Sequence, residues 1–541
     1  MKNLNFKIIL LVLTLGTFGF ISCTDDLDQS DPNSDSLLSG EELFSNPDSY
    51  IQFLAKLYAG LATAGQDGED RNPDISGIDP GESQYIRGLW KMQELSTDEA
   101  IVAWDDKTLY DFHFHTWASN DLFILATFSR LDFQVKNSNE FLRQTTAEKL
   151  QARGLSADLI NDIEGYRAEA RFLRALSYWH FIDLFGSVGL VTEEDPTDFF
   201  LPEQASRQEL FDFVEAELLE ITGEVSGNGS ELPDVGSIEY PRADKGAAWM
   251  LLSKLYLNAE VYTGTPRYSD ALTFLTKVIN AGYTLHPEYE ELFLADNDVN
   301  GAQNEFIFSV AFDGQRTQTF GGTTFLVHAS VGGKMKPEDF GINSGWFGLR
   351  TTSALVNKFQ LGVDSRDLFF TEDQSLEIND VTSFNDGYAV SKWKNVDVNG
   401  NPGSNHPRGE FVDTDFPMFR LADAYLMYAE AVLRGGGGSE ADAVRYVNLV
   451  RQRAFGDSYT PINAGTLNLQ FILDERAREL YWEAHRRTDL IRFNQFTGGA
   501  YIWPWKGNVM NGAPTASFRD LFPIPSNAIA GNPKLVQNPG Y

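Results

Sequence analysis

Apolar residues recur at intervals of three and four positions over long stretches of the chain, which is the period of an amphipathic α-helix. In residues 156–185 the pattern is complete, with Ser156 placed to cap the start of a helix and Gly186 placed to end it. Further segments with the same period are residues 207–225, 244–262, 268–280, 421–433, 439–454 and 469–493. The pattern predicts a mainly α-helical fold.

Two of these predicted helices follow each other closely and carry matching small residues, Ala248 in the first and Ala271 in the second. Small residues allow two antiparallel helices to approach while bulky residues fill the groove between them, as in a tetratricopeptide unit. Segments 421–433 and 439–454 form a second pair around a glycine-rich turn. The pairs are irregularly spaced, so we expect a helical scaffold that carries insertions rather than an open solenoid.

Residues 65–118 and 296–415 lack the helical period. The first stretch is rich in Gly, Asp and Pro, and then places His113 and His115 alternately with phenylalanines, as on one face of a strand. The second contains Gly, Asn and Asp clusters with short β-type runs. Insertions on a rigid scaffold often carry binding sites. Since no Pro-rich or Ser-rich linker interrupts the chain, residues 42–541 are predicted to form a single body.

Residues 1–22 have the form of a bacterial secretion signal. Lys2 and Lys7 stand before an apolar run over residues 8–20, which is too short to remain as a transmembrane helix. Cys23, the only cysteine, follows a small residue as in a lipobox, where the thiol is acylated and becomes the new N-terminus. The alternative is an ordinary signal peptide with an incidental cysteine. Residues 23–41 are rich in Asp and Ser and are predicted to form a flexible tether.

The charge balance excludes some partners. Without Lys2 and Lys7 the 43 basic residues become 41, against 77 acidic residues, so the mature chain would carry a net charge of −36. Such a field repels phosphate backbones, and we therefore expect no nucleic-acid partner. It also disfavours anionic membrane surfaces, which leaves the lipid as the attachment to the membrane. The single cysteine excludes disulfide bonds within the chain.

The order of several motifs matches a known family. The motifs are RAEARFLRALSYW at 167–179, ADKGAAWMLLSKLYL at 243–257, RLADAYLMYAEA at 420–431, ERAREL at 475–480 with HRRTDLIR at 485–492, and a C-terminus running from FPIP at 522–525 to QNPGY at 537–541. Behind the lipobox, this series resembles the SusD/RagB family of outer-membrane nutrient-binding lipoproteins along nearly the whole chain.

The resemblance implies a predominantly α fold with four tetratricopeptide-like units and a loop-rich face that binds glycan. It also implies a partner, a TonB-dependent transporter of the SusC type, over which the lipoprotein lies as a lid. The protein would be anchored by lipid in the outer membrane and face the cell exterior. The acidic residues after Cys23 resemble the surface-export signal of Bacteroidetes lipoproteins.

No catalytic residue is predicted. The sequence contains no Gly-x-Ser-x-Gly elbow, and the glycine run at 435–438 lacks the Lys and Ser or Thr of a phosphate loop. A glycosidase needs two carboxylates that face one bond. Glu94, Asp98 and Glu99 offer such a pair, but with 77 acidic residues chance pairs are expected.

No metal site and no cofactor is predicted either. His113 and His115 share one predicted face, but no third ligand accompanies them, so structural roles are favoured. Residues 296–301 imitate the start of a calcium loop, yet the twelfth position, which should be Glu, is Ile307. An EF-hand is thereby excluded, and a turn is expected instead.

Sugar binding needs flat aromatic faces for pyranose C–H groups, and polar side chains at the rim for hydroxyls. Trp104, Trp346 and Trp393 lie outside the helical patterns and are the candidate stacking residues. Asp105 and Asp106 follow Trp104 and are candidates for hydroxyl hydrogen bonds. The other tryptophans are predicted to be structural: Trp90, Trp117, Trp179, Trp249, Trp482, Trp503 and Trp505.

These observations lead to a first hypothesis, a cell-surface lipoprotein that captures an oligosaccharide or polysaccharide and delivers it to a SusC-like transporter. A β-glucan such as laminarin and a starch-like α-glucan both suit a curved aromatic surface. The second hypothesis is a structural lid for a transporter of non-glycan nutrients. The third is a surface glycosidase.

Overall fold

The structure, a computed structural model, describes residues 40–541 except 198, 199 and 228. The predicted signal at 1–22, the predicted acylation site Cys23 and nearly all of the predicted tether lie outside the described residues. The chain forms two compact units, which divide between residues 50 and 51. The first contains α2 (Gly40–Leu43) and the start of α3 (Ser49–Ala62). The second contains every later element.

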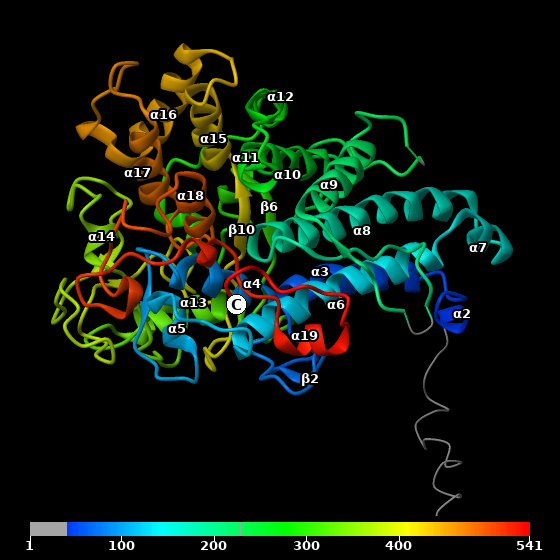
Figure 1. The fold of residues 1–541 in the computed structure, drawn as a ribbon, viewed down its shortest axis with the longest axis horizontal. Helices are drawn as coiled ribbons and strands as arrows, with labels where there is room; N and C mark the ends of the chain where they lie inside the picture. The colour runs from blue at the N-terminus through cyan, green and yellow to red at the C-terminus, as the bar shows by residue number, and fades with distance from the viewer. Residues whose placement is uncertain (1–39, 198–199, 228) are drawn as a thin grey trace, which may run out of the picture. The chain divides into compact units, whose positions relative to one another are not determined.

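The second unit is mainly helical, as predicted (Figure 1). Its longer helices are α6 (Leu122–Gln144), α8 (Ala157–Leu184), α9 (Arg207–Ile221), α10 (Lys245–Leu257), α12 (Tyr268–Ile279), α13 (Gly322–Ser330), α15 (Leu421–Leu433), α16 (Glu440–Phe455) and α17 (Leu469–Leu480). Its shorter helices are α4 (Tyr85–Trp90), α5 (Leu109–Phe114), α7 (Ala147–Ala152), α11 (Ala259–Thr263), α14 (Ser353–Val356), α18 (Arg486–Arg492) and α19 (Ser526–Gly531), and a π-helical turn η2 (Lys91–Leu95) continues α4.

The long helices pack mainly against their neighbours along the chain. Helix α6 packs on α8, α8 on α9, α10 on α12, and α15 on both α12 and α16. The predicted helix pairs are therefore confirmed. Between α15 and α16, the rings of Tyr425 and Tyr446 stack with centroids 4.7 Å apart, and Ala429 is fully buried. A small side chain at this position lets the two helices approach.

The end signals of the longest predicted helix are also confirmed. Ser156 Oγ accepts a hydrogen bond from the Leu159 N–H at 3.3 Å, which caps the start of α8. Gly186 follows the end of α8 with a φ of +77°, a backbone conformation in which a side chain would be strained.

Several helical features differ from the prediction. Residues 244–262 form two helices, α10 and α11, with Asn258 between them, and helices α3 and α13 were not predicted. Helix α6 was not predicted, because its buried face contains Arg130, Gln134 and Ser138, which interrupt the apolar period. The segment 469–493 is not one helix but two, α17 and α18, separated by a turn in which Trp482 and Ala484 have positive φ.

The turn between α17 and α18 places side chains in the core rather than extending the helix. The Trp482 indole N–H donates to the Glu99 carbonyl oxygen at 3.0 Å. The Glu483 carboxylate accepts hydrogen bonds from Arg420, at 2.6 and 2.8 Å. These partners lie far away in the sequence, so a local pattern contains no signal for the break.

The expected strand around His113 and His115 is a helix, α5, which ends at His115 in the left-handed conformation. Both histidines are buried, and burial lowers the pKa of each to about 3. The His115 imidazole Nε2 lies 2.7 Å from the Ser96 carbonyl oxygen. Alternating residues are compatible with a short helix when both faces pack against protein, as they do here.

The strands are short and form two-stranded antiparallel sheets among the described residues. The pairs are β1 (Gly65–Asp67) with β2 (Arg71–Pro73), β3 (Ile101–Val102) with β7 (Leu349–Arg350), β4 (Val188–Gly189) with β5 (Gln204–Ala205), β6 (Phe306–Val310) with β10 (Phe416–Arg420), and β8 (Phe369–Phe370) with β9 (Ala389–Val390). The β6–β10 pair is fully buried.

A buried ion cluster joins the second insertion to the C-terminal helices. Arg420, at the end of β10, pairs with Glu305, Glu479 and Glu483. Every one of these side chains is at most 1% exposed. Since a buried charge is costly without a partner, the cluster holds these segments in a single register.

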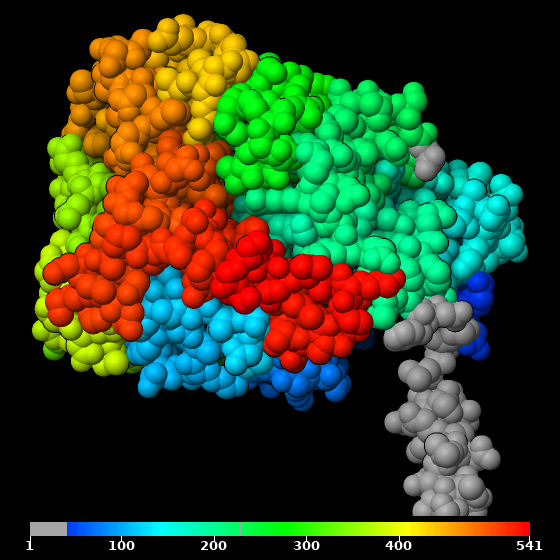
Figure 2. All heavy atoms as spheres, viewed as in Figure 1, coloured from blue at the N-terminus to red at the C-terminus, as the bar shows by residue number. Residues whose placement is uncertain are grey.

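The C-terminal segment (red) lies beside the segment that contains α5 (light blue) on the surface shown in Figure 2. The Trp117 indole N–H donates to the Tyr541 hydroxyl at 2.6 Å, and the Ser526 N–H donates to the Ser119 carbonyl oxygen at 2.7 Å. Among the described helices, none combines the length and the hydropathy that crossing a bilayer requires.

Candidate functional site

The short β3–β7 pair brings together two of the predicted stacking residues. Ile101 pairs with Arg350 and Val102 with Leu349, and the Ala103 N–H then donates to the Gly348 carbonyl oxygen at 2.8 Å. This register sets Trp104 beside the segment 346–348. Gly348 is required here, because a Cβ at this position would lie 2.4 Å from Cζ2 of Trp104.

Trp104 and Trp346 are in direct contact although 242 positions separate them in the sequence. The Trp104 indole N–H donates to the Trp346 carbonyl oxygen at 2.8 Å. The ring centroids are 6.3 Å apart and the planes meet at 45°. Both side chains are half-buried. The pair forms a bent aromatic surface in which the Trp104 indole N–H is already bound to protein.

Other side chains support the two rings from the protein side. The Trp346 ring stacks on His328 with centroids 4.7 Å apart and planes 23° apart. Phe325 meets the Trp104 ring edge-on at 6.2 Å. Burial lowers the pKa of His328, so its imidazole is neutral and gives Trp346 an uncharged stacking partner. Because these supports are buried, the rings are held in place before any ligand arrives.

Phe320 adds a third ring that the sequence analysis missed. Its centroid lies 6.3 Å from that of Trp346, with planes 50° apart, and 5.2 Å from that of the buried Phe411. Phe320 is half-buried and precedes the glycine pair that starts α13. An aromatic residue in a Gly-rich insertion was the only available signal. Trp104, Trp346 and Phe320 are called the aromatic platform below.

Polar groups border the platform at Phe320. The Arg87 guanidinium donates to the Phe320 carbonyl oxygen at 3.0 Å, and Asp70 Oδ2 accepts from the Phe320 N–H at 2.7 Å. Within the described part of the chain, the buried Asp70 Oδ1 has no hydrogen-bond partner. Burial raises the pKa of Asp70. Because this oxygen is itself closed to solvent, the clear role of Asp70 is to fix the backbone of Phe320.

The two predicted acidic residues lie on the other side of Trp104. Asp105 and Asp106 are exposed, in a loop that continues from β3. The loop is held by hydrogen bonds from the Tyr110 hydroxyl to the Ala103 carbonyl oxygen and from the Leu109 N–H to the Asp106 carbonyl oxygen, each 2.8 Å. The carboxylates therefore start from a fixed backbone next to the platform. Their role in glycan binding stays a prediction.

Trp393 does not belong to the platform, and its prediction as a stacking residue was wrong. It is 1% exposed, and its ring stacks on Phe416 with centroids 5.5 Å and planes 6° apart. Trp393 was selected because it lies outside the helical patterns, and a lysine stands on either side of it. However, Lys392 is itself buried and donates to Glu483 at 2.7 Å. With both ring faces inside the protein, Trp393 cannot contact a sugar.

The acidic residues considered for hydrolysis are also inside the protein. Glu94, Asp98 and Glu99 are each at most 1% exposed. Asp98 accepts two hydrogen bonds from Arg486, at 2.7 and 2.8 Å, and so has a structural partner. Across the described residues, no group of three His, Cys, Asp or Glu side chains is placed to hold a metal ion.

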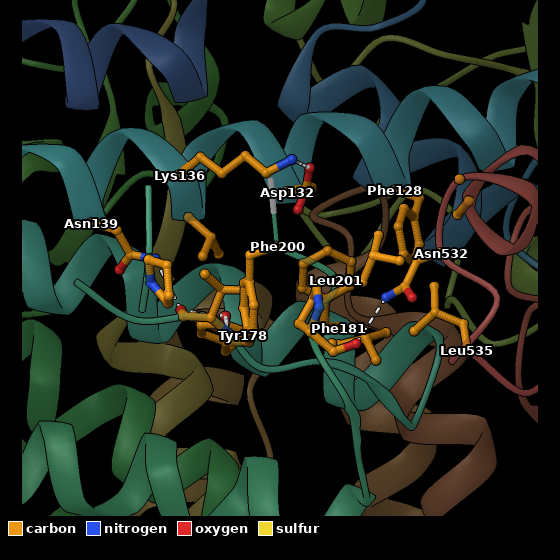
Figure 3. A pocket seen from close by; sticks show the side chains of 18 of the residues that line it. Phe128, Asp132, Lys136, Asn139, Tyr178, Phe181, Phe200, Leu201, Asn532 and Leu535 are labelled. Carbon is orange, nitrogen blue, oxygen red and sulfur yellow. Dashed lines mark hydrogen bonds and ion pairs between the residues drawn. The ribbon is translucent and has the colours of Figure 1, made fainter. Parts of the chain in front are cut away.

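A sizeable cavity lies elsewhere, between α6, α8, α19 and the segment that contains Leu201 and Pro202 (Figure 3). Its volume is about 590 Å³, and Phe128, Phe181 and Leu535 contribute to its apolar lining. Polar groups that line it are already hydrogen-bonded to the protein. The Tyr178 hydroxyl donates to the Val191 carbonyl oxygen, and the Asn532 amide donates to the Pro202 carbonyl oxygen, both at 2.8 Å. The cavity is large, but it offers few free groups to a hydroxyl-rich ligand.

Comparison with known proteins identifies the relatives of this chain. A sequence profile of the SusD family matches residues 370–541. The starch-binding protein SusD of Bacteroides thetaiotaomicron is 33% identical, over 97% of this chain and 96% of that protein.

Solved structures show the same fold. The surface glycan-binding protein A of Bacteroides fluxus aligns with a TM-score of 0.69 at 20% identity, over 92% of this chain and all of the other. The surface glycan-binding protein A of Bacteroides thetaiotaomicron, solved in complex with laminarihexaose, aligns with a TM-score of 0.66 at 19% identity, over 91% and 99% of the two chains. Both identities are below 25%, so these structures support the fold and not the ligand.

Proposed function

The chain belongs to the SusD family, and we propose that it captures an α-glucan of the starch type on the aromatic platform. Proteins of this family bind glycans and are not enzymes. The observation that carries the proposal is the contact between Trp104 and Trp346, two half-exposed rings with planes at 45°. A bent pair of rings suits a curved glucan, since each sugar can present its C–H face to one ring.

The polar groups around the platform fit the same ligand. Asp105 and Asp106, which directly follow Trp104, present exposed carboxylates. A glucan carries many hydroxyl donors and no charge, so acceptors that flank an aromatic surface complement it. The rings supply contact area and the acceptors fix the orientation of the chain.

The identity of the relatives favours an α-glucan over a β-glucan. The starch-binding SusD is 33% identical to this chain, whereas the protein bound to laminarihexaose is 19% identical. A laminarin-type β-1,3-glucan is the second candidate, because that complex belongs to a protein of the same fold and both glucans are curved. From the sequence, a β-glucan such as laminarin was the ligand named first, with a starch-like α-glucan as equally compatible with a curved aromatic surface.

We further propose that acylated Cys23 anchors the protein in the outer membrane, facing the cell exterior, and that the bound glycan passes to a TonB-dependent transporter of the SusC type. The lipobox pattern before Cys23 supports the anchor. Membership of the SusD family supports the transporter. The alternative role, a lid for a transporter of non-glycan nutrients, would leave the platform without a glycan ligand.

The test is a binding panel with the full-length protein in detergent. Amylopectin, laminarin and a β-1,4-glucan such as carboxymethylcellulose are cast separately into native gels, and the migration of the protein is compared with that in a plain gel. Retardation by amylopectin alone is the expected result. Retardation by laminarin alone would move the assignment to a β-1,3-glucan. Normal migration in every gel would overturn the glycan proposal and favour the lid.

A pair of variants locates the binding in the same gels. We expect Trp346→Ala to migrate freely, because it removes the central ring of the platform. Trp249→Ala is the matched control, since Trp249 is also half-buried but lies on α10, beside Lys277. Equal retardation of both variants would place the glycan away from the platform.

A further inference from the structure

Phe347 is the most exposed aromatic side chain in the described part of the protein, with 52% of its surface accessible. It directly follows Trp346 of the platform. An exposed phenylalanine is unfavourable in water unless its surface is used, and single cases are ordinary on protein surfaces. Exposure alone is therefore no indication of a ligand site.

The backbone at Phe347 is strained. Its φ is +55°, in the left-handed region that bulky residues avoid. Three consecutive hydrogen bonds impose this conformation. The N–H groups of Trp346, Phe347 and Gly348 donate to the carbonyl oxygens of His328, Val331 and Ala329, at 2.8, 3.0 and 2.9 Å. Such strain persists where the surroundings over-determine it, and it is frequent at ligand-binding sites.

The neighbours of Phe347 are shaped to hold its ring. Gly332 lies beneath it, and a Cβ at Gly332 would come within 2.7 Å of Cδ1 of Phe347. The buried Phe384 meets the ring edge-on, with centroids 5.6 Å apart and planes at 64°. Part of the ring thus rests on protein from two distant segments, while about half of its surface faces solvent.

The position of Phe347 ties it to the platform. Trp104 packs against both Trp346 and Gly348, the two residues that flank Phe347. The three-residue segment 346–348 is itself fixed on the end of α13 by the hydrogen bonds above. Asn385, which follows Phe384, is exposed, and its Oδ1 would lie 3.3 Å from a Cβ at Gly333.

We infer that Phe347 is a further stacking surface that extends the aromatic platform and makes the protein prefer long glucan chains over short ones. This inference rests on the proposed function. A short oligosaccharide is satisfied by the platform alone, whereas a longer chain continues past Trp346 and covers the exposed ring of Phe347. The strained backbone then has a physical reason, because it presents a ring that a relaxed residue would turn away.

The test compares chain lengths in calorimetric titrations of the parent and Phe347→Ala with maltotriose and maltoheptaose. We expect the affinity for maltoheptaose to fall about tenfold, as for the loss of roughly half of a buried aromatic contact. The affinity for maltotriose should stay within about twofold, because that ligand does not reach the ring. Leu361→Ala is the matched control, since Leu361 is 53% exposed on another loop. If the panel assigns a β-1,3-glucan, laminaritriose and laminarihexaose replace the two ligands.

Each other outcome is decisive. An equal loss for both lengths would overturn the inference, because Phe347 would then act through the platform itself. Unchanged affinity for both would overturn it as well. A parent that binds neither length would reject the proposed function, and the inference with it. The variant Phe347→Gly is a control for misfolding, because glycine adopts a positive φ without strain. Its melting temperature should be no lower than that of the parent, and it should still lose the preference for long chains.

Discussion

The aromatic platform and the core around Trp393 are made from the same residue types, tryptophan and phenylalanine beside charged residues. They differ in what the charged neighbours do. Next to Trp104, Asp105 and Asp106 are exposed. Next to Trp393, Lys392 is buried and paired with Glu483, and Trp393 is buried beside it. A charged neighbour in the sequence therefore indicates an exposed aromatic ring only when that charge has no partner inside the protein.

The largest effect is expected for the core ring. Trp393→Ala should lower the free energy of unfolding by about 3–5 kcal/mol, because it leaves a cavity between Phe293 and Phe416. Chemical denaturation of the parent and the variant measures this loss. The glycan affinity of the protein that remains folded should be unchanged. If affinity fell while stability held, the two regions would not differ in the way proposed.

Trp104→Ala should show the opposite pattern. Removing this platform ring should weaken glucan binding by about 2–3 kcal/mol, which corresponds to roughly 30–150-fold in affinity. The melting temperature should change little, since the side chain is only half-buried. Calorimetric titration and a thermal melt on the same sample separate affinity from stability. A lower melting temperature with full affinity would assign Trp104 to the core.

How well the sequence predicted a helix depended on whether the signals for its ends were local. Helix α15 was predicted with the bounds that the structure has, because its signals are local: apolar period, small residues and a following glycine turn. The break between α17 and α18 depends on Glu99 and Arg420, which are distant in the sequence. No local pattern contains that information.

The platform was predictable only in parts. Trp104 and Trp346 were each identified from their loops, but their contact follows from the β3–β7 register, which joins two insertions. Phe320 was missed because only tryptophans were taken as candidate stacking residues. Trp393 was misassigned because a residue outside the helical patterns can still be buried, and its partner Phe416 is not near it in the sequence.

The buried pair Glu94 and Glu99 should make the stability of the core depend on pH, while the glucan affinity of the platform should not. Burial, and then the Glu99 carboxylate, raises the pKa of Glu94 well above its ordinary value, and burial raises the pKa of Glu99 to about 8. The folded pair therefore keeps a proton that unfolded glutamates release above a pH of about 4.3. Stability from this pair is complete below that pH and is lost as the pH rises toward 8.

Glu94→Gln replaces the shared proton with a permanent amide donor, so its free energy of unfolding should fall less steeply than that of the parent between pH 5 and pH 8. Denaturation curves across this range measure the difference in slope. Glu377→Gln, at an exposed position, should follow the parent. Glucan affinity should not share this pH dependence, because the pair is at most 1% exposed. Parallel slopes for parent and Glu94→Gln would mean that the pair does not hold a proton.

The smallest effect is expected at the exposed acids of the platform. The double variant Asp105→Ala with Asp106→Ala should bind the glucan about 2–10-fold more weakly, since we expect the two carboxylates together to accept one hydrogen bond from a ligand hydroxyl, which contributes about 0.5–1.5 kcal/mol. Asp105→Asn with Asp106→Asn should keep most of the affinity, because an amide oxygen still accepts a hydrogen bond while the charge is gone. A glucan is uncharged, so added salt should change neither result. Asp162→Ala, on the exposed face of α8, serves as the control. If the double alanine variant bound like the parent, the loop after Trp104 would not reach the ligand, and recognition would depend on the rings.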